Sequence, residues 1–173
     1  MSMRPVRVRM AADGSSAWIP MNRYPSSFGV ALGVAFSSNK NLTAAVEYAL
    51  DPLEGQPCNI SRSTTTATLT LTNHGLSVGD SIIVSDAPAP LAGTYAVASV
   101  TNQNVITYTV TNSGATAAFG AKVIPLRIQV HPVLTGLTAD ADSNFSVPPT
   151  VARLTVSSYV AGYVDLNVVS GGG

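Results

Sequence analysis

The chain has 173 residues, of which 46% are hydrophobic and only 10% are charged, and nine basic and nine acidic residues cancel to zero net charge. This balance argues against a nucleic-acid binder, which needs a positive excess to neutralise phosphates, and a surface so poor in charge indicates association with partners. No apolar window approaches the roughly 18 residues of a membrane span, and the single cysteine, Cys58, excludes an intramolecular disulfide.

Alternation of apolar and polar residues predicts β-strands along most of the chain, because successive side chains of a strand point to opposite faces. The first expected strand is Val6–Met10. The segment 42–50 also fits a helical stripe that Asn41 could cap, but we expect a strand because its neighbours are strands. Further strands are expected at 66–72, 80–86, 93–101, 105–111, 124–131, 153–157 and 164–168.

The middle of the chain differs in composition from its two ends. Residues 61–121 are rich in Thr, Ser, Asn and Ala, and the breaks Gln56-Pro57 and Phe119-Gly120 mark the edges of this stretch. A handful of strands over about sixty residues can close a small core of its own. We therefore predict an all-β fold with an antiparallel β-sandwich base domain, formed by 1–60 and 122–173, and a small β module, 61–121, inserted in one of its loops.

Few residues could support catalysis or bind a metal. Cys58 would have to meet His74 or His131 to form a thiol–imidazole pair, and no enzyme signature surrounds it. Residues 140–144 alternate oxygen ligands in a weakly calcium-like way, but they lack the Gly and the distal Glu of an EF-hand loop, so a polar loop is expected. We predict no enzymatic activity, no catalytic or metal-binding residues and no cofactor.

Two groups of side chains near the N-terminus are candidates for a partner interface. The arginines on one face of the first strand could dock an acidic surface, or could form a solvated face that protects an edge strand. The segment around Trp18 contains the residue types enriched in interface cores, although Trp18 could instead anchor the core of the sandwich. The candidate interface residues are Arg4, Arg7, Arg9, Trp18, Arg23 and Tyr24.

Scattered motifs outside the predicted module resemble a family of small structural proteins of tailed bacteriophages. These motifs are Arg4-Pro5-Val6, Gly14-Ser15-Ser16-Ala17-Trp18-Ile19-Pro20, Phe28-Gly29-Val30-Ala31-Leu32-Gly33-Val34, Leu42-Thr43-Ala44-Ala45-Val46-Glu47-Tyr48 and the hairpin at 151–166. Inside the module, Asn73-His74-Gly75-Leu76-Ser77-Val78-Gly79-Asp80 is similar to a short β unit that recurs in phage particle proteins.

The resemblance implies a jelly-roll-like sandwich that binds the outside of a phage head as a decoration or cement subunit and stabilises the shell. The expected partners are the major capsid protein or another virion protein, and further copies of this chain in a dimer or trimer, with no nucleic acid and no membrane. The expected location is the virion, after synthesis in the cytoplasm of the bacterial host. The alternatives are a tail, collar or fibre-base component, or an adhesion module that binds glycans through aromatics such as Tyr95 or Tyr108.

Overall fold

The computed structural model describes residues 6–21, 29–111, 114–145 and 149–171. Every regular element in these ranges is a β-strand, and all the strand pairs are antiparallel, so the predicted all-β class is confirmed. The segment that also fitted a helical stripe is the strand β5 (Asn41–Ala49). The described residues include no helix that is long and apolar enough to cross a membrane.

The chain divides into two compact units. One unit combines residues 1–50 and 129–173, and we call it the jelly-roll unit; the other spans residues 51–128, and we call it the barrel unit. Each unit has its own cluster of buried apolar side chains. The expected module boundaries were 61 and 121, whereas the division falls at 51 and 128, because the long strands that flank the central stretch also pair within the barrel unit.

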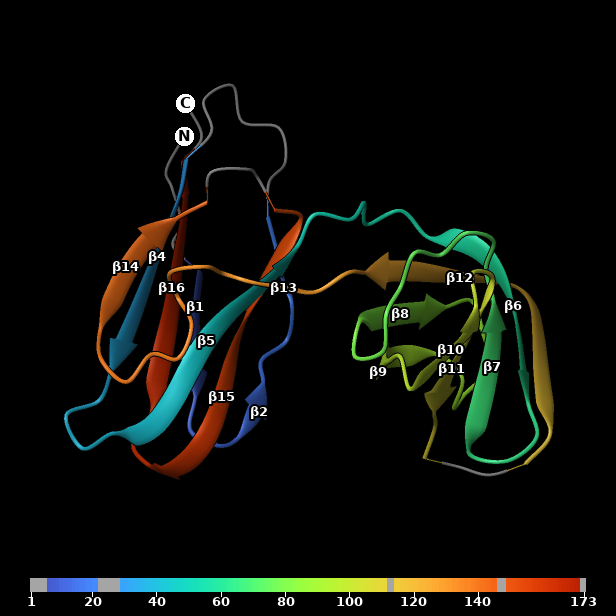
Figure 1. Cartoon of the computed structure of the whole chain (residues 1–173), viewed down its shortest axis with the longest axis horizontal. Helices are drawn as coiled ribbons and strands as arrows, with labels where there is room; N and C mark the ends of the chain where they lie inside the picture. Colours follow the sequence, from blue (N-terminus) through green and yellow to red (C-terminus); the bar gives the residue numbers. More distant parts are fainter. Residues whose placement is uncertain (1–5, 22–28, 112–113, 146–148, 172–173) are drawn as a thin grey trace. The chain divides into compact units, whose positions relative to one another are not determined.

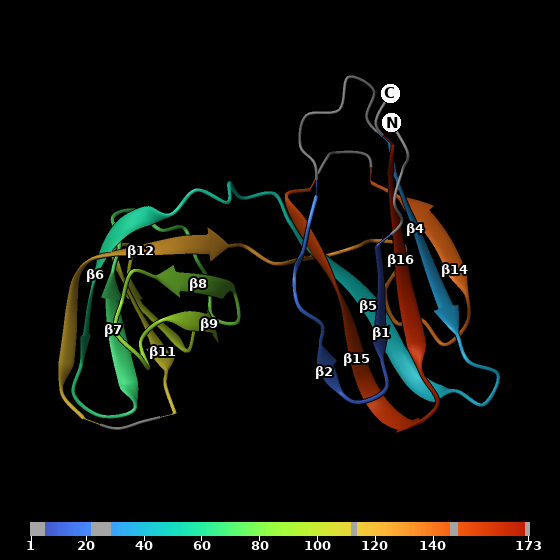
Figure 2. The same ribbon diagram turned by 180° about the vertical axis from the view of Figure 1, so that it is seen from behind.

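Two sheets form the jelly-roll unit, and Figures 1 and 2 show them packed face to face. The first has the strand order β1-β16-β4-β14, and the second has the order β13-β5-β15-β2, with β3 also paired to β15. The strands of the first sheet are β1 (Val6–Met10), β16 (Val164–Gly171), β4 (Gly29–Phe36) and β14 (Ala141–Asn144). Those of the second, besides β5, are β13 (Gln129–Val130), β15 (Val151–Ala161), β2 (Gly14–Ser15) and β3 (Ile19–Pro20).

The strand order of these sheets is that of a jelly roll. When β2 and β3 are counted as one interrupted strand, consecutive strands of the unit alternate between the two sheets at every connection except β5 to β13. This alternation, with the first and last strands paired to each other, is the double Greek key of viral capsid and lectin jelly rolls. The barrel unit is inserted at the β5–β13 connection, so the predicted sandwich with a small domain in a loop is confirmed.

Period-two patterning places the core between the two sheets. Leu32 and Val34 of β4 belong to one buried cluster with Val46 of β5, Leu154 of β15 and Leu166 of β16. The intervening residues of these strands point outward, because successive side chains of a strand alternate between faces. Apolar burial between the sheets therefore stabilises the unit and fixes the register of its strands.

The barrel unit is one sheet with the order β10-β11-β7-β6-β12-β8-β9. Its strands are β6 (Gln56–Arg62), β7 (Thr66–Thr70), β8 (Ser81–Ser85), β9 (Gly93–Ala96), β10 (Ser99–Asn102), β11 (Val105–Thr109) and β12 (Thr116–Leu126). The two end strands, β9 and β10, follow each other in the chain, and Val97 and Ala98 between them donate backbone hydrogen bonds to Asp80 and Thr107, both at 2.8 Å. The sheet thus closes on itself, which removes its open edges.

The structure breaks two of the expected strands. The expected strand 93–101 is the pair β9 and β10, because the chain bends there to close the barrel. The expected strand 124–131 is the end of β12 and the start of β13, because the chain passes from one unit to the other between them. The alternation of apolar and polar residues indicates which face of a strand each side chain lies on. It does not indicate where one strand ends and the chain passes to another.

Two carboxylates of the barrel unit, Asp51 and Asp80, bind the segment through which the chain leaves it. The buried Asp51 accepts hydrogen bonds from the backbone N–H of Arg127 at 2.6 Å and from its Nε at 2.8 Å. Asp80 accepts hydrogen bonds from the backbone N–H groups of Ile128, at 2.9 Å, and of Ser77, at 2.7 Å. The bonds from the Arg127 and Ile128 N–H groups satisfy backbone donors just beyond the last ladder pair of β12.

Candidate functional site

Arg7 and Arg9, two of the predicted interface residues, converge on one carboxylate of the neighbouring strand. They lie on β1, and both side chains donate to Asp165 of β16; Arg9 does so from Nε at 2.8 Å and from Nη2 at 3.0 Å. The Arg9 guanidinium also lies 3.8 Å from the centroid of the Tyr163 ring. Asp165 is only 1% exposed, and the hydrogen bonds from Arg9 and then Arg7 lower its pKa to about 2.

The contact with Asp165 affects how Arg7 and Arg9 could bind a partner. β1 is an edge strand of its sheet. The interpretation in which the arginines protect an edge strand requires this position. Asp165 neutralises part of their charge, while both guanidinium groups remain about half exposed. Arg4 lies outside the described residues, as do Arg23 and Tyr24. The use of Arg7 and Arg9 in partner binding stays a prediction.

Trp18 lies on the outer side of the second sheet rather than in the core. Its side chain is partly buried, it is absent from the core cluster, and the Arg153 guanidinium lies 4.2 Å from the centroid of its ring. Arg153 in turn donates from Nε to Glu47 at 2.7 Å, and the two residues are cross-strand partners on β15 and β5. The alternative in which Trp18 anchors the core is therefore wrong.

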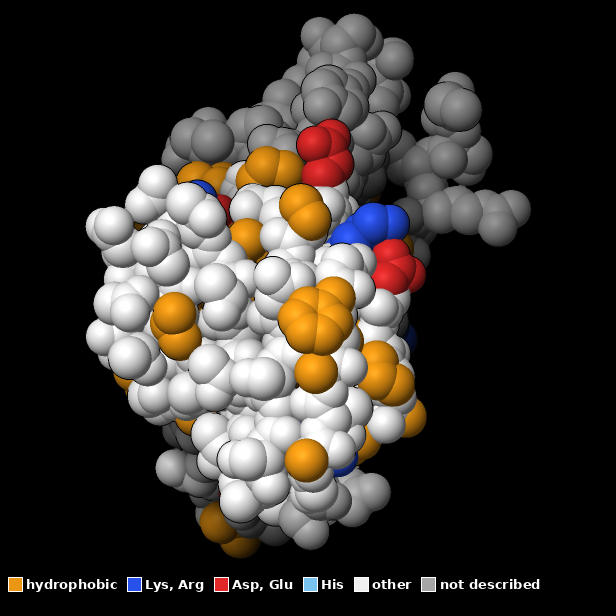
Figure 3. Space-filling view, turned by 90° about the vertical axis from the view of Figure 1, so that its right-hand side faces the viewer, with side chains coloured by type: hydrophobic (Ala, Val, Ile, Leu, Met, Phe, Trp, Pro, Cys, Tyr) orange, Lys and Arg blue, Asp and Glu red, His pale blue; other side chains and the backbone are white. Residues whose placement is uncertain are grey.

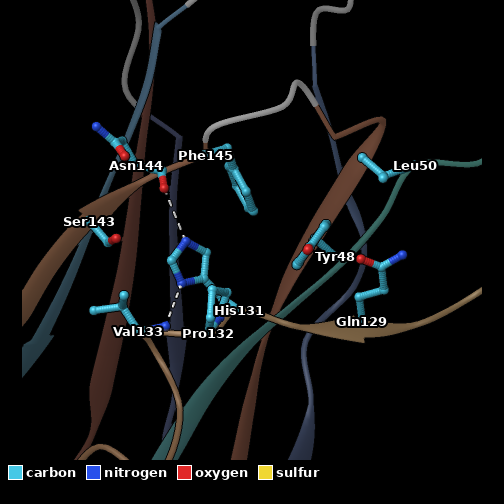
Figure 4. A pocket seen from close by; sticks show the side chains of 9 residues that line it. All are labelled: Tyr48, Leu50, Gln129, His131, Pro132, Val133, Ser143, Asn144 and Phe145. Carbon is cyan, nitrogen blue, oxygen red and sulfur yellow. Dashed lines mark hydrogen bonds between the residues drawn. The ribbon is translucent and has the colours of Figure 1, made fainter.

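A cavity of about 400 Å³ opens in the jelly-roll unit, where β5 and β13 meet the end of β14 (Figure 4). Three rings face it, with centroids 5.1 Å apart for Tyr48 and Phe145 and 5.2 Å apart for His131 and Phe145, in edge-to-face geometry. The remaining lining residues are Leu50, Gln129, Pro132, Val133, Ser143 and Asn144. Its volume lies in the range of ligand pockets, about 300–1,000 Å³.

His131 builds one wall of this cavity and has no free ring nitrogen. Its Nδ1 accepts hydrogen bonds from the backbone N–H groups of Val133, at 3.2 Å, and Leu134, at 3.1 Å, while Nε2 lies 3.1 Å from the Asn144 carbonyl oxygen. Because Nδ1 faces two donors and Nε2 faces an acceptor, the neutral ring carries its proton on Nε2. The imidazole thus fastens the loop after β13 to β14 and is not placed as a general base.

His74 does the same work in the barrel unit. Its Nδ1 accepts from the backbone N–H of Leu76 at 2.9 Å, and Nε2 lies 2.9 Å from the Asn102 carbonyl oxygen. Both histidines therefore cross-link a loop to a strand through backbone groups. In the sequence, the only sign of this role is that each histidine lies in or beside an expected turn. Its ring can there accept one hydrogen bond and donate another.

Cys58 and the acidic segment 140–144 also occupy structural positions. Cys58 is buried in the barrel core, and desolvation raises the pKa of its thiol to about 11, so that the thiol is protonated at neutral pH and is a poor nucleophile. The segment expected as a polar loop is mostly the strand β14, and the Asp140 carboxylate accepts the Phe36 N–H at 2.8 Å. Among the described residues, no three His, Cys, Asp or Glu side chains are placed to hold a metal ion.

The two tyrosines named for glycan binding pack inside the barrel unit. Tyr108 is fully buried and its hydroxyl donates to the Leu91 carbonyl at 3.1 Å. Tyr95 packs against it with ring centroids 4.6 Å apart, and its hydroxyl donates to the carbonyls of Pro90 and, at 3.0 Å, Ala92. They do not line an exposed groove, because their rings fill the core and their hydroxyls bind the loop before β9.

Comparison with known proteins adds little. No family model matches the chain, and no curated protein matches it. Among solved structures, an endosialidase of phage phi92 is similar over 73% of this chain, with 20% sequence identity and a TM-score of 0.35. The match covers 16% of the endosialidase chain, so this chain spans only a small part of that protein's length. A similarity this slight assigns neither a fold nor a function.

Proposed function

We propose that this chain is a structural protein of a bacteriophage particle, and that it binds the outside of the head as a decoration subunit. The observation that carries the proposal is an eight-stranded jelly roll with a barrel inserted at one connection. Jelly rolls recur in viral capsid proteins, and the longer motifs outside the module that resemble phage structural proteins fall on β2 to β5, β15 and β16 of this unit.

The charge-poor composition supports the same proposal. Only 10% of the residues are charged, and their net charge is zero. Electrostatic repulsion between copies of the chain is therefore weak, which suits a subunit that functions within an assembly. Many symmetric copies of such a subunit would stabilise a shell, because each copy binds the assembled shell and not the separated shell subunits.

The docking surface that we propose is the outer face of the second sheet around Trp18. Tryptophan and arginine are the residue types most enriched among binding hot spots, and here an arginine stacks on the tryptophan ring. The Arg153–Glu47 ion pair holds that arginine in place, so the stack is ordered before a partner arrives. Preorganisation of this kind lowers the entropic cost of association.

Quantitative mass spectrometry of purified particles tests the location. A head decoration subunit is expected at a copy number comparable to that of the major capsid protein. A few copies per particle would contradict head decoration and would favour a tail, collar or fibre-base component. Absence from the particle would overturn the structural role altogether.

Trp18→Ala tests the docking surface. We expect its affinity for particles to fall at least about tenfold, measured as occupancy at subsaturating concentration, because truncation of a hot-spot tryptophan costs about 2 kcal/mol or more. The matched control is Val160→Ala, which removes a 69% exposed apolar side chain from β15 of the same unit. Equal occupancy of the two variants would contradict docking through Trp18.

A further inference from the structure

The barrel unit presents an aromatic ring to solvent at a β-bulge. Phe119 of β12 is 83% exposed, and it pairs with Asn59 of β6 just before the register shifts. The next residue, Gly120, has φ +73°, a left-handed conformation that favours glycine. A bulge re-aims the side chains beside it and is often found next to a functional site. Gly120 thus permits the bulge beside which the Phe119 ring points to solvent and not into the core.

The neighbours of Phe119 on the sheet are hydroxyl and amide side chains. Asn59 pairs with Phe119 on one side and with Thr70 of β7 on the other, so the three residues form one cross-strand row. All three are exposed, and directly paired side chains on a sheet lie about 5 Å apart. This row combines an apolar ring face with an amide and a hydroxyl that can donate and accept hydrogen bonds.

A hollow of about 220 Å³ lies beside this row. Its lining residues are Pro57, Cys58, Asn59, Thr70, Thr72 and Gly120. The volume is below the roughly 300–1,000 Å³ of pockets that enclose a drug-sized ligand, so it suits one ring of a larger molecule. Asn59 and Thr70 belong to both the row and the hollow, and the hollow is also lined by Gly120, the residue that follows Phe119.

The surroundings are electrically neutral. None of the residues that line the hollow is charged. The nearby Lys122 of β12 forms an ion pair with Asp86 at 2.8 Å, which neutralises its charge. Figure 3 views the chain from the right-hand side of Figure 1, where β6 and β12 lie, and shows mostly uncharged polar side chains and backbone with scattered apolar groups and few charges.

We propose that the row Thr70–Asn59–Phe119 and the adjacent hollow form a binding site for a neutral saccharide. The face of an aromatic ring is the negative side of its quadrupole, so it attracts the C–H groups on one face of a pyranose. The amide and hydroxyls then hydrogen-bond the sugar hydroxyls at the ring edge. With no unpaired charge at the site, an anionic sugar gains nothing over a neutral one.

A protein partner fits this surface less well. Stable protein interfaces bury about 1,200–2,000 Å² in total, around a fully buried core enriched in apolar and aromatic side chains. The row and hollow instead offer one large apolar side chain among hydroxyls and an amide. The inference does not depend on the proposed role in the phage head, since a virion protein of any location could carry this site.

The experiment titrates the ¹⁵N-labelled full chain with neutral oligosaccharides of glucose, galactose and N-acetylglucosamine, and follows the backbone amide signals. Sialylated and sulfated oligosaccharides serve as charged probes. We expect a neutral oligosaccharide to shift the signals of Cys58, Asn59 and residues 70–72 and 117–121. No shift with any neutral probe at millimolar concentration, or shifts confined to other residues, would overturn the proposal.

Substitutions at the exposed Phe119 separate ring stacking from simple apolar contact. Phe119→Ala and Phe119→Leu should each weaken saccharide binding at least tenfold, whereas Phe119→Tyr should retain it within about threefold, because only tyrosine keeps the ring face. Asn59→Ala should weaken binding several-fold through the lost hydrogen bonds.

The matched control is Val78→Ala, since Val78 is a 66% exposed apolar residue of the same unit. Binding by this variant should equal that of the unchanged chain. Saccharide binding that survives in Phe119→Leu would contradict the stacking role. A different outcome would indicate a protein partner at this site and contradict the saccharide proposal. In that outcome no saccharide binds, and the chain captures a particle protein that Phe119→Leu still binds and Phe119→Ala does not.

Discussion

Asp165 joins the side chains of the first strand to the neighbouring strand β16. It is buried, yet it stays ionised because Arg7 and Arg9 of β1 donate to it from the adjacent strand. Its pKa falls to about 2 from the ordinary value of 3.8. A carboxylate with a depressed pKa stabilises the folded state above its unfolded pKa, and the contribution disappears as the pH falls through the folded pKa.

We expect Asp165→Asn to lower the free energy of unfolding of the jelly-roll unit by up to about 2 kcal/mol at pH 7. The difference from the unchanged chain should shrink as the pH falls from 4 to below 2, because Asp165 is protonated first in the unfolded state and then, around its folded pKa of about 2, in the folded state. Urea unfolding followed by the fluorescence of Trp18, the sole tryptophan, measures this unit. A difference that is the same at pH 2 and pH 7 would contradict the assignment.

His131 provides a second test at the level of one side chain. His131→Phe keeps a ring against Tyr48 and Phe145, but it removes the acceptor for the Val133 and Leu134 N–H groups. Buried donors without a partner cost about 1–3 kcal/mol, so the jelly-roll unit should lose stability in that range. Trp18 fluorescence during urea unfolding reports the change. A loss below about 0.5 kcal/mol would show that the hydrogen bonds are not needed.

At the level of elements, the bulge in β12 depends on Gly120. We expect Gly120→Ala to destabilise the barrel unit by about 1–2 kcal/mol, because a Cβ disfavours the left-handed conformation of this residue. Labelling of the buried Cys58 thiol in increasing urea monitors the opening of the barrel. The control, Ala117→Ser, lies at an exposed position of the same strand and should have no effect. Equal midpoints for both variants would contradict a strained bulge.

The sequence predicted most strands because alternation survives in both units. Val6–Met10 is reproduced as β1, and the expected strands 66–72 and 105–111 contain β7 and β11. Long-range contacts could not be predicted in this way. The contact of Arg7 with Asp165, and of Trp18 with Arg153, depends on which strands are neighbours and in what register. A single sequence does not record that pairing.

The candidate saccharide site was hidden for a related reason. The sequence alone places Phe119-Gly120 at the edge of the predicted module, where the composition of the chain changes. In the structure the pair lies inside the longest strand of the barrel unit. The bulge becomes visible only when Phe119 and Ala121 are matched to Asn59 and Cys58 of the partner strand.

At the scale of the whole molecule, the two units have separate cores and separate reporters. Trp18 lies in the jelly-roll unit and Cys58 in the barrel unit, and each is the sole residue of its type. We expect fluorescence and thiol labelling to give two different urea midpoints, because separate cores need not unfold together. Substituting Leu154→Ala should shift the fluorescence midpoint alone, and Ile106→Ala the labelling midpoint alone. Joint shifts in both variants would contradict two independent cores.

The proposed function is most directly tested by a cryo-EM reconstruction of the intact particle at a resolution that traces β-strands. The account predicts many symmetric copies of the jelly roll on the outside of the head, with the β5–β15 face around Trp18 against the shell. Finding the chain in the tail or collar, or docked through a different face, would contradict the corresponding part of the account. A head surface that carries no jelly roll of this chain would refute the decoration role.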